Sequence, residues 1–387
     1  MHPLPPHPDS ALDLLDTDLG ERMWPHEAAI TARITDLIQR ALIRRYPSDQ
    51  RPVRRDAHPK AHGCVRAEFR VEHNLPARLA HGVFYPGARY HAWVRFSNGN
   101  PDPTRHDMRG DARGMAIKLI GVPGQKVLHA EQDARTQDFV LISHPTFFAA
   151  DPARYATFLE RATSPSALGR ASALFALGWQ GASVALRTAQ KRIVSPLETR
   201  YWSTVPSQLG LGSRRMAVKY SVRPSAAGHA TLPADPSPDF LREALISHLR
   251  EEDASFDFLV QPRSGDGMSV EDPRERWDEG EAPMIKAATL LIPRQIFTGA
   301  GQETFGENLS FTPWHTLPHH RPLGGMNRVR RDVYQAISTL RHALNGITPY
   351  EPSGEELFPQ LAPQAWVGPA RGLPPPWIGP APKAPPR

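Results

Sequence analysis

The sequence predicts an α+β fold, in which an antiparallel β-barrel carries an N-terminal helical arm and added helices. Two observations support this prediction. Short segments with strand-like alternation of apolar and polar residues recur on both sides of a longer helical stretch, and such alternation indicates strands with one buried face. Apolar residues at helical spacing mark a separate helix near the N-terminus. A chain of 387 residues can bury a large core in one domain with appended helices.

Composition divides the chain into three regions. Residues 1–50 are expected to form an N-terminal arm and helix, because the first part is marked by Pro and Asp and the second by helical periodicity. Residues 51–345 are expected to form the barrel and its helices. Residues 346–387 are rich in proline, with PPPW and PAPKAPP runs that cannot form a core, so we expect an extended tail.

The individual elements follow from periodicity. A helix is predicted from His26 to Tyr46, where apolar residues recur every three or four positions. Seven strands are predicted in short alternating or apolar segments. They cover residues 64–71, 90–97, 115–120, 137–142, 216–222, 256–261 and 285–291. A helical block is predicted over residues 152–195, and residues 297–325 are predicted to be mostly loop because Gly, Pro and polar residues dominate there.

The most informative stretch is the helix that follows this loop, which carries Arg330, Tyr334 and Arg341. At about 100° per residue, Arg330 and Tyr334 lie roughly 40° apart around the axis, and Arg341 returns to within roughly 20° of Arg330. A free phenol titrates near pH ~10, so a tyrosine that binds a metal as phenolate needs a fixed positive neighbour. Arg341 lies about 10–11 Å beyond Tyr334, a reach suited to an anionic arm of a large planar cofactor. A tyrosinate-ligated haem requires this pattern, although the same spacing also occurs on ordinary solvated helices.

Three motifs occur upstream of the helix that carries Tyr334. They are RRDAHPKAHG around residue 58, WVRFSNG around residue 95, and RGDARGMAIKL after it. In this order, these blocks resemble the haem catalases and their smaller catalase-related relatives. The similarity covers roughly residues 50–160 and 285–345. The third block stands where the family has Asp-Pro-Arg-Gly-Phe-Ala, and here it runs from Asp111 to Ala116.

The resemblance implies a catalase-like barrel that encloses haem b (iron protoporphyrin IX), and it assigns roles to individual residues. His58 is the expected distal histidine, Ser97 orients it, and Tyr334 is the expected iron ligand. The residues expected to contact the haem are Arg55, Arg95, Arg330, Arg341, Phe147 and Tyr155. Arg55, Arg95 and Arg341 would bind the propionates, and Tyr155 stands where catalases have an aromatic residue that stacks on the haem.

The residue pattern independently supports the roles of Arg95 and His58. Alternation in YHAWVRFS, residues 90–97, places Arg95 and Ser97 on one strand face. A buried arginine there needs an anion, such as a propionate or a carboxylate like Asp111. A free histidine titrates in a useful range for proton transfer to and from a peroxide, which makes His58 a candidate base, and His62 is its rival four residues later.

The departures from the family pattern concern the distal side. Where catalases have a distal asparagine beside the histidine, this chain has Ile142, which offers no hydrogen bond to a second hydrogen peroxide. Ser143 is a substitute only if the backbone is shifted by one residue. The neighbouring Phe147 and Phe148 add apolar surface of the kind that an organic hydroperoxide prefers, and plain core packing explains them equally well.

Composition narrows the remaining choices. The formal net charge is +6 and the pI is about 9.6, but no nucleic-acid-binding motif accompanies the basic residues. The single cysteine, Cys64, excludes an internal disulfide framework. The start of the chain lacks the pattern of a secretory signal, so a cytoplasmic location is expected. The apolar segment from Ala171 to Ala189 predicts a helix packed on the barrel, or alternatively a surface that contacts a membrane and admits lipid substrates.

These observations predict a haem-dependent oxidoreductase of the peroxidase type, with hydrogen peroxide or a lipid hydroperoxide as substrate. Two alternatives remain at this stage. One is an enzyme that rearranges or cleaves fatty-acid hydroperoxides, as catalase-related allene oxide synthases do, and the other is a binding protein without catalysis that holds haem or has lost it. A homo-oligomer is a further expectation, because catalases are commonly tetramers and the N-terminal arm can exchange between subunits.

Overall fold

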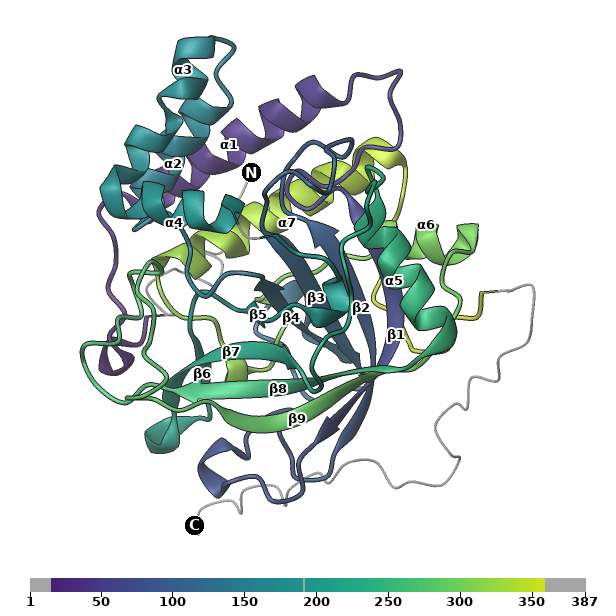
Figure 1. The fold of residues 1–387 in the computed structure, drawn as a ribbon. Coiled ribbons are helices and arrows are strands. Elements are labelled where there is room, and N and C mark those ends of the chain that lie inside the picture. Colours follow the sequence, from purple (N-terminus) through teal and green to yellow (C-terminus); the bar gives the residue numbers. More distant parts are fainter. Residues whose placement is uncertain (1–14, 191, 359–387) are drawn as a thin grey trace, which may run out of the picture.

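The computed structural model of the protein describes residues 15–190 and 192–358, and its centre is an antiparallel barrel (Figure 1). The strands follow one another in the order β5-β4-β3-β2-β1-β9-β8-β7, and β7 pairs back with β5, which closes the ring of eight. A further strand, β6, pairs with β7. The strands are β1 Ala61–Val71, β2 Arg89–Asn98, β3 Arg113–Ile120, β4 Thr136–Ile142, β5 Tyr201–Trp202, β6 Ser207–Leu209, β7 Met216–Pro224, β8 Ala254–Pro262 and β9 Ile285–Ile292. The predicted fold class is confirmed.

The barrel interior holds the main hydrophobic core. Alternate residues of β1 (Val65, Ala67, Phe69 and Val71) lie in it with at most 3% of their surface exposed. Phe69 packs edge-on against Phe258 of β8, with 5.1 Å between the ring centres. Burial of each such large apolar side chain is worth about 1.5–3 kcal/mol. The alternation read from the sequence is therefore the alternation between core and outer surface.

The helices cover one end and the sides of the barrel (Figure 1). They are α1 Glu27–Arg45, α2 Pro152–Ala162, α3 Ala167–Ala171, α4 Gly178–Gln190, α5 Phe240–Glu251, α6 Ala300–Asn308 and α7 Gly325–Asn345. The long helix α7 packs against α1, and α1 packs against α2, through a small core of their own. This core consists of Ile34, Ile38, Ala156, Val329 and Val333.

The structure corrects the sequence prediction in several places. All seven predicted strands are present, but β5 and β6 were missed because two or three residues show no period. The helix α5 was also missed. The segment 297–325 is not all loop, because α6 occupies Ala300–Asn308. The helical block 152–195 is divided into α2, α3 and α4, and α4 packs on the 3-10 turn Ala173–Leu177 rather than directly on the barrel wall.

The segment after α7 lies along the barrel up to residue 358. Glu351 forms an ion pair of 2.8 Å with Lys118 of β3, whose side chain is fully buried. Phe358 packs on Phe305 of α6, with ring centres 5.1 Å apart. Residues 359–387, where the proline-rich runs lie, are outside the described residues. Among the helices that the structure describes, none has the length and hydropathy needed to cross a membrane.

Candidate active site

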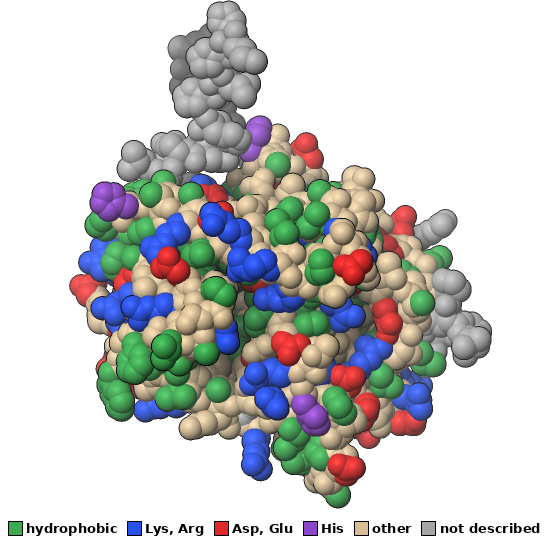
Figure 2. All heavy atoms as spheres, turned by 90° about the horizontal axis from the view of Figure 1, so that it is seen from above, with side chains coloured by type: hydrophobic (Ala, Val, Ile, Leu, Met, Phe, Trp, Pro, Cys, Tyr) green, Lys and Arg blue, Asp and Glu red, His purple; other side chains and the backbone are tan. Residues whose placement is uncertain are grey.

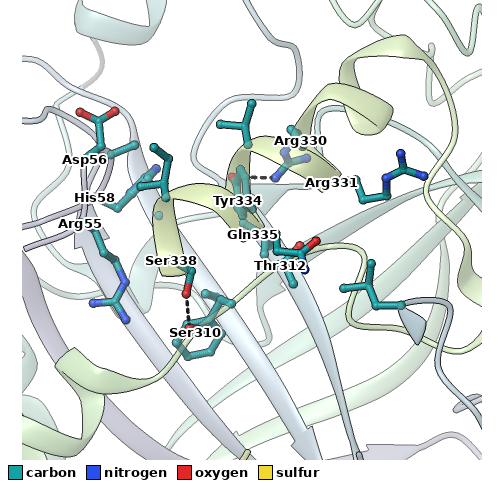
Figure 3. Close-up of a pocket in the computed structure, with 18 of the residues that line it drawn as sticks. Arg55, Asp56, His58, Ser310, Thr312, Arg330, Arg331, Tyr334, Gln335 and Ser338 are labelled. Carbon is teal, nitrogen blue, oxygen red and sulfur yellow. Dashed lines mark hydrogen bonds between the residues drawn. The ribbon is translucent and has the colours of Figure 1, made fainter. Parts of the chain in front are cut away.

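A cavity of about 760 Å³ lies between the barrel and helices α1, α2 and α7 (Figure 3). All nine residues that the sequence assigns to the site line this cavity. They are Arg55, His58, Arg95, Ser97, Phe147, Tyr155, Arg330, Tyr334 and Arg341. They come from five separate parts of the chain, so the fold brings together what the sequence had only placed in order. The volume falls in the usual range for a cofactor or substrate pocket.

His58 stands in the segment just before β1, with a left-handed backbone conformation (φ 61°). Its Nδ1 lies 3.0 Å from the Ser97 Oγ, so the two share a hydrogen bond and Nε2 is left for the cavity. Burial, together with the nearby guanidinium groups of Arg95 and Arg55, lowers the pKa of His58 to about 3. A histidine that stays neutral can accept a proton at neutral pH.

Gly114 of β3 makes room for this histidine. A Cβ at Gly114 would stand 2.5 Å from His58 Nδ1 and 2.9 Å from Ser97 Oγ, closer than real contacts allow. In the sheet, Gly114 pairs with Ser97 on one side and with Ile142 on the other. Gly114 belongs to the third sequence motif, but no role was predicted for it. Its position could have indicated one, since a glycine in a strand interior often marks the close approach of another group.

The rival histidine His62 and the neighbouring Lys60 both point away from the cavity. His62 is fully buried, and its Nε2 lies 2.8 Å from Asn98 Oδ1. Lys60 forms ion pairs of 2.8 Å with Asp107 and 2.7 Å with Asp239. Neither His62 nor Lys60 lines the cavity. The geometry therefore singles out His58.

On helix α7, Arg330 and Tyr334 meet as the spacing predicts. The Arg330 Nη2 donates a hydrogen bond of 3.1 Å to the Tyr334 hydroxyl (Figure 3). Its Nη1 donates to Asn327 Oδ1, also at 3.1 Å, which fixes the guanidinium. A fixed positive charge at the phenol oxygen stabilises its ionised form.

The beginning of α7 is held by buried carboxylates, which fix where Tyr334 stands. Gly324 N donates to Glu21 at 2.7 Å and Gly325 N donates to Glu271 at 2.9 Å. These bonds satisfy amides that a helix start leaves without partners, and negative charge there also complements the helix dipole. Arg328 balances the carboxylates through an ion pair of 2.9 Å with Glu21 and a further one with Glu27. These carboxylate contacts at the start of α7 were not predicted from the sequence.

The three predicted propionate arginines converge at one end of the cavity, around Glu307 of α6. The Glu307 carboxylate lies 3.2 Å from Arg55 and 3.7 Å from both Arg95 and Arg341. Burial, together with the proximity of Arg55, lowers the pKa of Arg95 to about 9 and that of Arg341 to about 10. Three guanidinium groups thus face a single carboxylate. Asp111, the alternative partner considered for Arg95, pairs with Arg113 instead, at 3.5 Å.

Several polar atoms in this cluster lack a hydrogen bond. Within the described part of the chain, Arg55 Nη1 and both Nε and Nη2 of Arg95 are buried without a hydrogen bond, although Arg55 Nη1 and Arg95 Nη2 lie within ion-pair distance of Glu307. Buried charged donors that lack hydrogen bonds are costly. The cluster is therefore suited to bind further anionic groups.

The side of the cavity near His58 is apolar. Ile142 lines it, whereas Ser143 does not, because the Ser143 Oγ accepts a hydrogen bond of 2.9 Å from the Arg113 amide. Phe147 also lines the cavity, and its ring centre is 5.5 Å from that of Tyr155. Burial raises the pKa of Tyr155, so this phenol stays protonated. Phe148 stacks behind Phe147, 4.3 Å away, outside the lining.

Three solved structures share this architecture. A bacterial catalase aligns with a TM-score of 0.59, covering 86% of this chain and 68% of that one. A fungal catalase aligns with a TM-score of 0.55 (84% and 74%), and catalase A from Saccharomyces cerevisiae with 0.53 (76% and 61%). Each is 16% identical in sequence, so these matches concern the fold.

A curated sequence relative points the same way. The chain is 28% identical over 276 residues to a catalase-related peroxidase of Mycolicibacterium paratuberculosis (strain ATCC BAA-968 / K-10), across 66% of this chain and 79% of that protein. The protein has a catalase-like fold. The resemblance inferred from its motifs is thereby confirmed, although no protein-family model matches the chain. Glu307, which contacts the three arginines of the candidate site, was not predicted, because the sequence predicts residues 297–325 to be mostly loop.

Proposed function

We propose that this catalase-like protein binds haem b between His58 and Tyr334 and uses it to consume peroxides. The observation that carries the proposal is the convergence of Arg55, Arg95 and Arg341 at one end of the cavity that also holds His58 and Tyr334. Haem carries two propionates. Together with Glu307 they would balance the three guanidinium groups charge for charge.

Each residue then has a defined task. Tyr334, ionised beside Arg330, would hold the iron, and the three arginines would hold the propionates. When bound, the haem supplies the redox chemistry that breaks the peroxide O–O bond. His58 takes the proton from one peroxide oxygen at Nε2 and returns it to the other, while Ser97 at Nδ1 keeps the ring oriented.

The apolar distal side favours organic hydroperoxides over rapid disproportionation of hydrogen peroxide. Ile142 gives a second hydrogen peroxide no hydrogen bond, and Phe147 and Tyr155 extend the apolar wall. The name of the relative, a catalase-related peroxidase, supports a peroxidase activity for this chain as well. The same wall favours, as a second candidate, the rearrangement or cleavage of a fatty-acid hydroperoxide.

A side-by-side assay tests the proposal. The protein is loaded with hemin, its absorption spectrum is recorded, and it is given hydrogen peroxide, cumene hydroperoxide and an unsaturated fatty-acid hydroperoxide. We expect a Soret band, slow oxygen release, and faster loss of the organic peroxides with a reducing co-substrate. Conversion of the fatty-acid hydroperoxide without a co-substrate would favour the second candidate.

The variant Tyr334→Phe tests the iron ligand. We expect it to change the spectrum and weaken hemin binding, whereas Tyr350→Phe, which alters another tyrosine of the cavity wall, should leave both unchanged. If hemin produces no Soret band with the unaltered protein, the chain is a haem-free binding protein and the proposal fails. A cytoplasmic location and a homo-oligomer remain predictions.

A further inference from the structure

The helical layer α2–α4 carries large hydrophobic side chains that point away from the protein. Phe175 is 82% exposed, Trp179 90% and Leu168 83%. Leu174 and Leu186 are 40% and 50% exposed. These five residues, which we call the apolar face, lie within one stretch of nineteen positions, 168–186. Such a concentration of exposed aromatic and aliphatic surface marks an interaction site.

Packing within the protein does not account for the apolar face. The same segment has an inward stripe, and Leu177, Gly181 and Val184 of that stripe are buried. Gly181 lies so close to the Phe148 carbonyl that a Cβ would stand 2.3 Å from its oxygen. On α4, Trp179 and Leu186 are seven positions apart and therefore share the other side of the helix. A helix with apolar side chains on its outer side as well as its inner side is expected to contact a second apolar surface on the outer side.

The charged residues within the stretch 163–190, which carries the apolar face, are of one sign. No Asp or Glu occurs between residues 163 and 190, whereas Arg170 and Arg187 are exposed there. Neither arginine pairs with a carboxylate in the part of the chain that the structure describes. In the view from above, hydrophobic and basic side chains, with some acidic ones among them, lie on the left, the side on which α2–α4 stand (Figure 2). The face is thus complementary to an anionic, apolar environment.

We propose that the apolar face docks on an anionic lipid surface. Tryptophan prefers the boundary between headgroups and acyl chains, and arginine reaches anionic headgroups while its stem stays in apolar surroundings. A partner protein would require matching carboxylates and a complementary groove, whereas a lipid surface requires only apolar insertion and positive charge. The docking is peripheral, in keeping with the absence of a membrane-crossing helix among the described residues.

Docking there would bring lipid close to the cavity, because the same layer forms part of its wall. Tyr155 of α2 lines the cavity, and Phe148 and Phe158 pack beside it toward the outer helices, with ring centres 6.1 Å and 6.5 Å from Tyr155. Docking of the apolar face on lipid does not require haem, and it is independent of whether the chain consumes peroxides.

Vesicle flotation tests the proposal on the full-length chain. Vesicles of phosphatidylcholine alone are compared with vesicles that also contain phosphatidylglycerol, at low and high salt. We expect binding to the anionic vesicles that weakens in high salt. The double variant Phe175→Ser, Trp179→Ser should lower the partition coefficient at least ~10-fold, since two large apolar side chains no longer insert.

The matched control is Tyr85→Ser, which removes an aromatic side chain of 52% exposure far from the apolar face in sequence. It should bind anionic vesicles as the unaltered protein does. Equal binding by the double variant, or no preference for anionic vesicles, would overturn the proposal. A dimer that the double variant abolishes, without vesicle binding by the unaltered protein, would also overturn it and assign the face to a second copy.

Discussion

Gly114 lies directly against His58, so close that a Cβ on Gly114 would stand 2.5 Å from the His58 Nδ1. The imidazole that is proposed to move protons therefore depends on the absence of a side chain on the neighbouring strand. Because the same Cβ would meet Ser97 Oγ at 2.9 Å, it would also disturb the bond that orients the ring.

Gly114→Ala should displace His58 while Tyr334 keeps its place. We expect the hemin-loaded variant to retain its Soret band but to consume peroxide at least ~10-fold more slowly, because proton transfer loses its positioned base. Overpacking should also cost about 1–3 kcal/mol of unfolding free energy. Gly267→Ala is the control, since a Cβ there meets nothing within 4 Å. An unchanged peroxide rate in Gly114→Ala would contradict the assigned role of His58.

Glu307→Gln should separate the stability of the empty site from its affinity for haem. The substitution leaves Arg55, Arg95 and Arg341 without their shared carboxylate, so the haem-free protein should lose about 1–3 kcal/mol of unfolding free energy. The affinity for hemin should rise several-fold, because its propionates meet more uncompensated positive charge. Denaturant unfolding and hemin titration measure the two effects.

The control for that experiment is Glu303→Gln on the same helix, which alters an exposed ion pair with Arg242. It should change both quantities little. Weaker hemin binding in Glu307→Gln would contradict the assignment of the arginine cluster to the propionates.

Ile142→Asn should restore a hydrogen-bonding group to the distal side. Oxygen release from hydrogen peroxide should increase by roughly 10-fold or more, because a positioned donor at such a site is worth about that much or more. Turnover of cumene hydroperoxide should not increase. Ile142→Val keeps the wall apolar and should leave oxygen release low. An oxygen electrode measures the rates, and equal oxygen release from Ile142→Asn and the unaltered protein would remove Ile142 as the cause.

The haem-free protein should lose stability as pH falls below about 6.5, the value near which an unfolded histidine titrates. Burial lowers the pKa of His58 and His320 to about 3 and that of His62 to about 4. The unfolded chain therefore binds more protons between about pH 6.5 and these values, and folding weakens by up to about 1.4 kcal/mol per pH unit for each histidine.

Denaturant unfolding at several pH values in this window measures the slope. His320→Gln should reduce the slope by the contribution of one histidine, whereas His229→Gln, at an exposed position, should not change it. Stability that is constant from neutral pH down to about pH 5 would show that these histidines are not held neutral by the fold.

Much of the barrel was predictable because each long strand carries its own signal. In β1, the alternation of Val65, Ala67, Phe69 and Val71 reports the buried face without any knowledge of neighbouring strands. The two residues of β5 carry no such signal, yet their pairing with β7 closes the ring. The helix α6 was missed for a related reason, since its glycines and polar residues resemble a loop locally, and its stabilising contacts are with β1 and with Phe358, far away in the sequence.

The sequence motifs were sufficient to identify the side chains of the candidate site, namely His58, the arginines and Tyr334, and helical spacing was sufficient to place Arg330 beside the phenol. The packing of distant segments was needed to show that Glu307 pairs with the arginine cluster, that Gly114 leaves room for His58, and that the apolar face points outward. Helical and strand periods relate residues a few positions apart, whereas these relationships join parts of the chain that meet only when the barrel closes and the helices pack around it.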